Sequence, residues 1–324
     1  METQDIITRI KHFLTASDWV PGDCAVSFLA AGEYNANYTI QSKTGRFVLR
    51  INHGSQLGLG DGQIEYEYRV LETLADSGVT PRPFACDPAP EGLEGGVLLM
   101  EYLPGKPLNY ARDLERAAGI FARVHRVQAP EGLVDQPDPV QDICRECRGL
   151  IRRYPDHPLR REREAIEAYF QSVQELAAET RDLFSNEEPC LVNTEVNANN
   201  FLISEQGAYL VDWEKAVLSS RYQDLGHFLV PTTTLWKSDT VLSRADKQRF
   251  LQAYQQEAGL DCRLEELSRK ARILEKTILL RALSWCYMAY YEYTQTERAI
   301  QNRDTFAKIK QYLEDIPGIV ASVP

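Results

Sequence analysis

The sequence predicts a two-lobed α+β protein, because its apolar pattern changes character once along the chain. Strand-like segments with alternating apolar residues dominate the first hundred residues. Beyond the stretch Glu101-Tyr-Leu-Pro-Gly105, whose Pro-Gly pair favours a turn, the pattern becomes almost wholly helical. We therefore expect an N-terminal lobe over residues 1–103 and a helical lobe over residues 104–324. The cleft between two such lobes is the default place for a site.

The bulk properties narrow the function classes. A net charge of −11 argues against a sequence-independent nucleic-acid binder, which needs a basic face. No apolar run approaches the roughly 18 residues of a membrane span, and the first residues lack the pattern of a signal peptide. Seven scattered cysteines suit a reducing compartment, so we expect a cytoplasmic protein. Cys144 and Cys147 form a lone C-x-x-C, a spacing that one helical turn produces without metal or redox chemistry.

The N-terminal lobe is expected to contain two helices and four strands. The helices are expected at 3–16 and 63–74, and the strands at 25–31, 37–42, 47–52 and 95–100. The turn at 31–37 holds Gly32, Asn35 and Asn37, residue types that tolerate unusual backbone angles and allow close backbone approach. Its N–H groups are suited to capping phosphates.

One strand and one helix of this lobe carry charged residues of interest. In the strand 47–52, Phe47, Leu49 and Ile51 share one face, and Arg50 lies on the other. In the following helix the apolar residues point inward, and Glu67 is expected on its surface. The loop 53–63, with its Gly-Leu-Gly-Asp-Gly stretch, has the wrong spacing for a dinucleotide fingerprint and is interpreted as flexible.

The second lobe is predicted to be helical except for one hairpin. A charged region runs from Arg145 to Arg163. The helices are expected at 111–127, 162–184, 220–229, 243–257, 263–296 and 303–314.

The hairpin brings polar residues together. Its strands are Phe201-Leu-Ile203 and Tyr209-Leu-Val211, separated by a glycine-containing turn. Folding about this turn places Asn200 beside Asp212, since paired strand residues have Cβ atoms about 5 Å apart. Glu195 lies in the loop that leads into the hairpin. Two carboxylates and an amide oxygen suit a Mg²⁺ ion and a proton acceptor.

These elements, in this order, resemble the aminoglycoside phosphotransferase and choline kinase family, which has a protein-kinase-like fold. That family has a catalytic loop His-x-Asp-x-x-x-x-Asn and a later Asp-x-Asp/Glu. The matching residues here are Asn193, Glu195 and Asn200, followed by Asp212-Trp-Glu214. Tyr222-Gln-Asp224 resembles a later family segment in which the aspartate braces the loop, and Arg123-Val-His125 resembles the end of a family helix. The chain departs from the pattern at Asn193, which replaces His, at Glu195, which replaces Asp, and at Arg50, which replaces Lys.

The resemblance implies an ATP- and Mg²⁺-dependent phosphotransferase that acts on a hydroxyl group of a small molecule, such as an amino alcohol, an aminoglycoside or a sugar. It assigns Glu195 and Asn193 to catalysis. It assigns the metal to Asn200, Asp212 and Glu214. It assigns the nucleotide to Gly32, Asn35, Asn37, Arg50, Glu67, Met100, Glu101 and Leu103.

Several alternatives stay open at this stage. A catalytically impaired relative, or pseudokinase, would bind nucleotide and act as a regulator or binding module. Glu65 replaces Glu67 as the partner of Arg50 if the helix has a different register. The aromatic residues from Trp285 to Tyr293 form either core or a pocket for quaternary ammonium groups, and their spacing favours core. Trp236 and Asp239 lie in a segment that would face the acceptor. The protein is expected to be a monomer or a homodimer.

Overall fold

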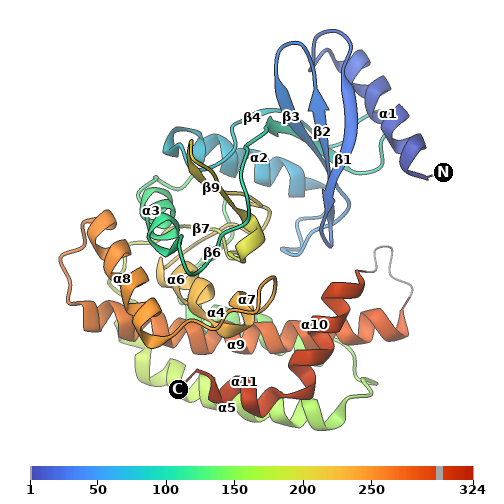
Figure 1. The fold of residues 1–324 in the computed structure, drawn as a ribbon. Helices are drawn as coiled ribbons and strands as arrows, with labels where there is room; N and C mark the ends of the chain where they lie inside the picture. The colour runs from blue at the N-terminus through green and yellow to red at the C-terminus, as the bar shows by residue number, and fades with distance from the viewer. Residues whose placement is uncertain (1, 297–301, 324) are drawn as a thin grey trace.

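The N-terminal lobe is built on one antiparallel sheet. The computed structural model describes residues 2–296 and 302–323. Five strands pair in the order β1-β2-β3-β5-β4, and the helices of the second lobe lie below this sheet in Figure 1. The strands are β1 (Ala25–Ala31), β2 (Asn35–Gln41), β3 (Arg46–Asn52), β4 (Pro83–Asp87) and β5 (Gly96–Glu101).

The two faces of this sheet have different neighbours. Helix α1 (Glu2–Ser17) covers one face, where Leu49 and Ile51 of β3 join a small apolar cluster. Helix α2 (Gln63–Leu74) covers the other, and Val48 there joins the main core. The expected alternation of β3 is thus confirmed, and it directs Arg50 away from α1 toward the second lobe.

The hairpin forms as expected. Strands β8 (Phe201–Ile203) and β9 (Ala208–Leu210) pair in antiparallel register, with Phe201 opposite Leu210. The amide of Val211 donates to the carbonyl of Asn200 at 2.8 Å, which extends the ladder by one bond toward Asp212. A three-stranded sheet beside it joins β6 (Asp135–Gln136), β7 (Cys190–Val192) and β10 (Val217–Ser219).

The second lobe is organised around one long helix. Helix α9 (Leu264–Gln295) is unbroken and packs against α4, α5, α6, α8 and α10 (Figure 1). The other helices are α3 (Leu114–Val124), α4 (Pro139–Arg152), α5 (Arg160–Thr180), α6 (Tyr222–Leu229), α7 (Pro231–Thr234), α8 (Arg244–Ala258), α10 (Arg303–Glu314) and α11 (Ile316–Ala321). Short 3₁₀ turns occur at 60–62, 75–77, 181–183 and 198–200.

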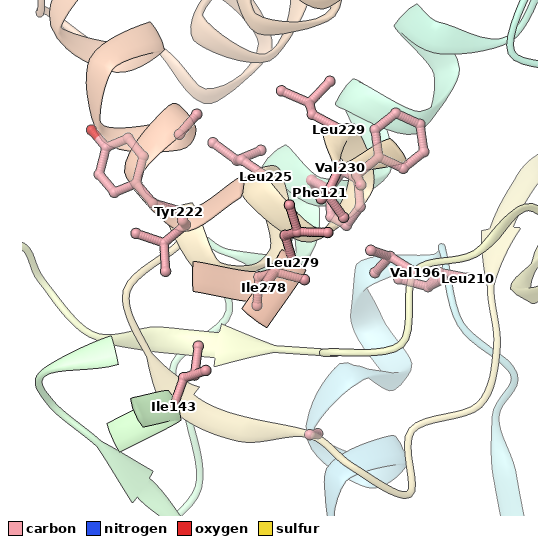
Figure 2. Packing of buried hydrophobic residues seen from close by; sticks show 14 of the residues in the cluster. Phe121, Ile143, Val196, Leu210, Tyr222, Leu225, Leu229, Val230, Ile278 and Leu279 are labelled. Atoms are coloured by element: carbon pink, nitrogen blue, oxygen red, sulfur yellow. The ribbon is translucent and has the colours of Figure 1, made fainter. Parts of the chain in front are cut away.

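The main core fixes the loop that carries Glu195. Val196 and Leu210 belong to the same apolar cluster as Phe121 of α3 and Leu279 of α9 (Figure 2). Val196 is fully buried, and burying such a side chain stabilises the fold by about 1.5–3 kcal/mol. The residue next to Glu195 therefore anchors the polar loop from below.

Some elements differ from the sequence prediction. Helix α4 lies partly inside the stretch 145–163 that reads as a charged region; its buried residues recur every three or four positions between the charges. Strand β4 was not expected, because Pro83 opens it and prolines punctuate the segment before it. The three-residue strands β7 and β10 are too short to produce a periodic signal.

Cys144 and Cys147 are buried in α4, and all seven cysteines are free thiols. Burial raises the pKa of Cys144 to about 11 and that of Cys147 well above its ordinary value.

Within the residues that the structure describes, no helix combines the length and apolar character needed to cross a bilayer.

Candidate active site

A cavity of about 610 Å³ lies between the sheet and the helical lobe. The β1–β2 turn, β3 and the end of β5 line one side, and the hairpin, α6, α9 and α10 line the other. Most residues assigned to a site from the sequence line this cavity: Gly32, Asn35, Asn37, Arg50, Met100, Glu101, Leu103, Glu195, Asn200, Asp212 and Glu214. Asn193 and Glu67 do not line it; both are buried behind its wall.

Three carboxylates meet at the centre of the cavity wall. Oxygen atoms of Glu195, Asp212 and Glu214 lie within 4.8 Å of one another. Burial raises the pKa of Glu195, although the charge of Lys215 opposes the shift. Burial and the charges of Asp212 and Glu195 raise the pKa of Glu214 well above its ordinary value. Such a cluster favours a bound cation, which relieves the mutual repulsion.

Polar side chains from the N-terminal lobe hold this cluster. The Gln56 amide donates to Glu195 Oε1 and to Glu214 Oε1, at 3.3 Å each. The Asn35 amide donates to Glu214 Oε2, and Asn35 Oδ1 accepts from Asn52 at 2.8 Å. Asn35 therefore points at the carboxylates. Gln56 comes from the loop 53–63, and its contribution was not foreseen from the sequence.

Arg50 links the two lobes. Its Nη1 lies 2.6 Å from Glu67 Oε1 and 2.9 Å from Asp212 Oδ1, and its Nε donates to Asn37 at 3.0 Å. Burial alone would lower the pKa of Arg50, but the charges of Glu67 and Asp212 raise it. The pairing with Glu67, rather than with the exposed Glu65, is thus confirmed.

The position of Glu67 on its helix corrects one expectation. Glu67 was expected on the surface of α2, but only 1% of its surface is exposed. Burial raises its pKa even though Arg50 opposes this shift. The helix buries Glu67 because β3 presents a guanidinium to it, a pairing that apolar periodicity does not reveal.

A buried aspartate braces the loop that carries Glu195. Asp224 accepts hydrogen bonds from the amides of Asn193 and Thr194, at 2.9 Å each, and lies 3.3 Å from His125 Nε2. The bracing role that the resemblance gave to Asp224 is therefore confirmed. Asn193 extends the brace: its Nδ2 donates to the carbonyl of Asp212 at 2.8 Å, and its Oδ1 accepts from the amide of Glu195 at 2.9 Å.

Two residues of the site have unusual backbone angles. Thr194 has φ +65° and Asp212 has φ +69°, in the left-handed region that such residues rarely adopt. Strain of this kind costs about 1–3 kcal/mol and persists only where the surroundings enforce it. Here the bonds to Asp224 and Asn193 enforce it. Thr194 directly precedes Glu195, and Asp212 itself belongs to the carboxylate cluster.

Asn200 completes the loop. Its Nδ2 donates to the carbonyl of Glu195 at 2.6 Å, and its amide oxygen has no hydrogen-bond partner in the described part of the chain. The backbone bond between Val211 and Asn200 and the shared cavity place Asn200 next to the end of the strand that leads to Asp212.

Comparison with known proteins agrees with this arrangement. The model of the phosphotransferase enzyme family termed APH matches residues 25–273, which include the sheet, the hairpin and the start of α9. The chain belongs to this family. No curated protein sequence matches it significantly.

Solved structures of similar fold include several small-molecule kinases. An ethanolamine kinase from Plasmodium vivax superposes with a TM-score of 0.67 at 11% identity, over 100% of this chain and 92% of that one. The choline kinase LicA from Streptococcus pneumoniae gives a TM-score of 0.65 at 16% identity, over 98% and 99% of the two chains. A spectinomycin phosphotransferase, solved with ADP and spectinomycin, gives 0.59 at 13%, over 98% and 97%. The family member described here shares their kinase-like fold.

The helical side of the cavity contains residues that sequence reasoning missed. Lys215 lies 3.5 Å from Glu195 Oε1, and its place directly after Glu214 was an available signal. His227 and Arg281 line the cavity from α6 and α9. No local pattern distinguishes these two, because chain folding alone brings them to the site.

The aromatic segment of α9 divides between the two expected alternatives. Trp285 lines the cavity together with Trp236, and their rings meet edge to face at 5.8 Å. Tyr287 and Met288 are buried in the core. Asp239 does not line the cavity; it is fully exposed and lies 4.0 Å from Lys308.

Helix α9 also reaches the opposite lobe. Near its C-terminal end, Tyr293 Oη donates to Glu33 Oε1 at 3.1 Å. Glu33 belongs to the β1–β2 turn that was expected to cover phosphates. One helix therefore both lines the cavity and contacts the β1–β2 turn of the opposite lobe.

Proposed function

We propose that this protein transfers the terminal phosphoryl group of ATP to a hydroxyl group of a small molecule, with Mg²⁺ as cofactor. The observation that carries this proposal is the convergence of Glu195, Asp212 and Glu214 within 4.8 Å, in a cavity that Arg50 also lines. Family membership supports phosphoryl transfer as the reaction type.

The donor set fits a hard divalent cation. Asp212, Glu214 and Asn200 offer oxygen atoms, which are the ligands that Mg²⁺ prefers. Bound there, Mg²⁺ would neutralise phosphate charge. Three carboxylates face two cations, Arg50 and Lys215, so the cluster retains a net negative charge for the metal.

The upper wall is assigned to the nucleotide. Gly32 and Asn37 border the phosphates, and Met100, Glu101 and Leu103 border the base at the end of β5. Arg50 contacts the phosphates when a phosphate oxygen replaces Asp212 as its partner. We assign Glu67 and Asn35 to positioning, because Glu67 holds Arg50 and Asn35 holds Glu214.

The lower wall is assigned to the acceptor. Glu195 orients the acceptor hydroxyl and accepts its proton, which suits a carboxylate whose pKa is raised by burial. Asn193 is a positioning residue, since it ties the amide of Glu195 to the carbonyl of Asp212. We also propose that the lobe boundary lies between Leu103 and Pro104. The proposal further includes a cytoplasmic location and a monomeric or homodimeric state.

Thermal unfolding with and without Mg-ATP tests the nucleotide and metal assignments. We expect Mg-ATP to raise the melting temperature of the wild type and to lose this effect in Asp212→Ala. Asp156→Ala is the matched control, because Asp156 is exposed in the loop between α4 and α5. Equal behaviour of wild type and Asp212→Ala would contradict the metal assignment.

A transfer assay separates the enzyme from a pseudokinase. Phosphate transfer from ATP is measured with amino alcohols, aminoglycosides and sugars as acceptors. The alternative, a nucleotide-binding regulator, has one observation in its favour: Glu195 already contacts Lys215 and Gln56. Stabilisation by Mg-ATP without transfer to any acceptor would select that alternative.

A further inference from the structure

A buried cation without a counter-ion lies in the acceptor wall of the cavity. Arg281 of α9 is 7% exposed and lines the cavity. Its Nη2 donates to the carbonyl of Thr194 at 3.4 Å and to His227 Nδ1 at 3.2 Å. Among the described residues, no carboxylate forms an ion pair with it. Removing a guanidinium from most of its water without a counter-ion is unfavourable, so an anion bound beside Arg281 would be stabilised there.

The free edge of Arg281 faces the cavity. Its Nε and Nη1 have no hydrogen-bond partner among the described residues, and neither atom is enclosed. An arginine that presents adjacent N–H groups in a fixed plane matches the two oxygens of a carboxylate or a phosphate. The contacts that fix the plane, Thr194 and His227, come from the protein itself.

The neighbouring charges reinforce the positive character of this wall. Burial and the charges of Arg281 and Lys215 hold the pKa of His227 well below its ordinary value, so its imidazole is neutral and accepts from Arg281. Lys237 also lines this side. Glu146 is the one acidic residue at the acceptor wall apart from the carboxylate cluster, and it forms no ion pair with Arg281 in the described part of the chain.

We propose that the acceptor of this phosphotransferase carries an anionic group, a carboxylate or a phosphate, which Arg281 binds while the acceptor hydroxyl faces Glu195. The proposal rests on the proposed function and names its substrate class: small hydroxy acids or phosphorylated alcohols rather than amino alcohols. Arg281 contacts the carbonyl of Thr194, the residue directly before Glu195. The anionic group and the reacting hydroxyl are therefore close together, as in a compact acceptor.

The rest of the wall agrees with a small acceptor. Ile278, Ala282, Trp285 and Cys286 line the cavity with Arg281 and occur at helical spacing on α9. These apolar side chains cover the carbon skeleton of a ligand and exclude water around the guanidinium. Exclusion of water strengthens the attraction between Arg281 and an anion.

The first experiment measures anion binding without turnover. Thermal unfolding is followed in sodium sulfate and in sodium chloride at equal ionic strength, for the wild type, Arg281→Met and Arg272→Met. Arg272 is the matched control, because it lies exposed on the same helix. General salt effects act on all three proteins alike. We expect sulfate to raise the melting temperature more than chloride does in the wild type and the control, with most of this difference lost in Arg281→Met. An equal difference in all three would overturn the proposal.

The second experiment compares matched acceptors and needs no variant to fold. Phosphate transfer from Mg-ATP is measured with 3-hydroxypropanoate, 3-hydroxypropanamide and 3-amino-1-propanol, which share one chain length. A charge-assisted pair with Arg281 should raise kcat/KM of the acid at least about tenfold over its amide, which corresponds to about 1.4 kcal/mol. Arg281→Lys keeps the charge without the fork, so it should retain part of this ratio. Preference for the amino alcohol would overturn the proposal.

The two experiments separate failure of this inference from failure of the proposed function. If Mg-ATP neither stabilises the protein nor supports transfer while the sulfate effect depends on Arg281, the kinase function fails and the anion site stands. If transfer occurs to neutral or cationic acceptors and sulfate acts equally on Arg281→Met, the function stands and the anionic acceptor is wrong. When no acceptor of the series reacts, the sulfate comparison decides.

Discussion

Replacing Asp224 by asparagine tests the brace beneath the loop that carries Glu195. The side chain is fully buried and accepts from two loop amides at 2.9 Å each, with His125 as a third neighbour. Hydrogen bonds to a charged group contribute about 1.5–3 kcal/mol each. Asparagine keeps one acceptor oxygen, but its NH₂ group opposes the second amide donor and the charge is lost.

We expect Asp224→Asn to lower the free energy of unfolding by about 3 kcal/mol, because one charged bond is lost and one amide is left without an acceptor. At roughly 2–3 °C per kcal/mol for a chain of this size, the melting temperature falls by about 6–9 °C. Circular dichroism at increasing temperature measures the fall. Because the loop carries Glu195, a displacement of about 1 Å also lowers the transfer rate roughly a hundredfold.

The matched control is Asp156→Asn, which changes an exposed aspartate and should alter stability by less than about 0.5 kcal/mol. A melting temperature of Asp224→Asn equal to that of the control would refute the reasoning. A stable variant with an unchanged rate of phosphate transfer would also refute the reasoning, because the brace would then have no part in positioning Glu195.

Three further expectations concern other parts of the chain. Glu195→Asp withdraws the carboxylate by about one methylene and should lower kcat about a hundredfold; a higher kcat would show that the longer side chain hinders transfer. Gly226→Ala places a Cβ within 2.6–2.8 Å of atoms of α9 and should lower the free energy of unfolding by about 1–3 kcal/mol. In Gly119→Ala the new Cβ meets no atom within 4 Å, so this variant should stabilise α3 by up to about 1 kcal/mol. Chemical denaturation of both variants measures the two changes. Burial lowers the pKa of His157 in the folded protein, so the unfolded chain binds a proton at this histidine before the folded protein does as the pH falls. The free energy of unfolding that the neutral His157 contributes above about pH 6.5 should therefore decline below that pH. His157→Gln should show a smaller decline in melting temperature over the same range, and an unchanged decline would assign it to other groups.

Local patterns were sufficient for the main features of the fold. The alternation in β3 and the glycine turn between β8 and β9 depend on neighbouring residues, so they are readable from the chain. Helix α4 was missed because its charges conceal the periodic Ile143, Cys147 and Ile151. Strand β4 has only five residues and begins with a proline, so it shows no clear alternation.

The site was predictable only where one short segment supplies it. Asn200 and Asp212 follow from the hairpin register. The burial of Glu67 follows from its partner on β3, which lies 17 residues away and is invisible to a pattern within α2. Gln56 and Arg281 reach the cavity through tertiary folding, and no local motif marks either residue as part of a site.

Helix α9 has a consequence for how new activities arise on this scaffold. Much of the acceptor wall comes from one face of the single unbroken helix α9, while the carboxylates that would hold the metal follow strand β9. Substitutions along that face can change which molecule is accepted without altering the reaction chemistry. Engineering of acceptor choice should therefore begin with Ile278, Ala282 and Trp285. Tyr293 should be kept, because it connects the same helix to the β1–β2 turn.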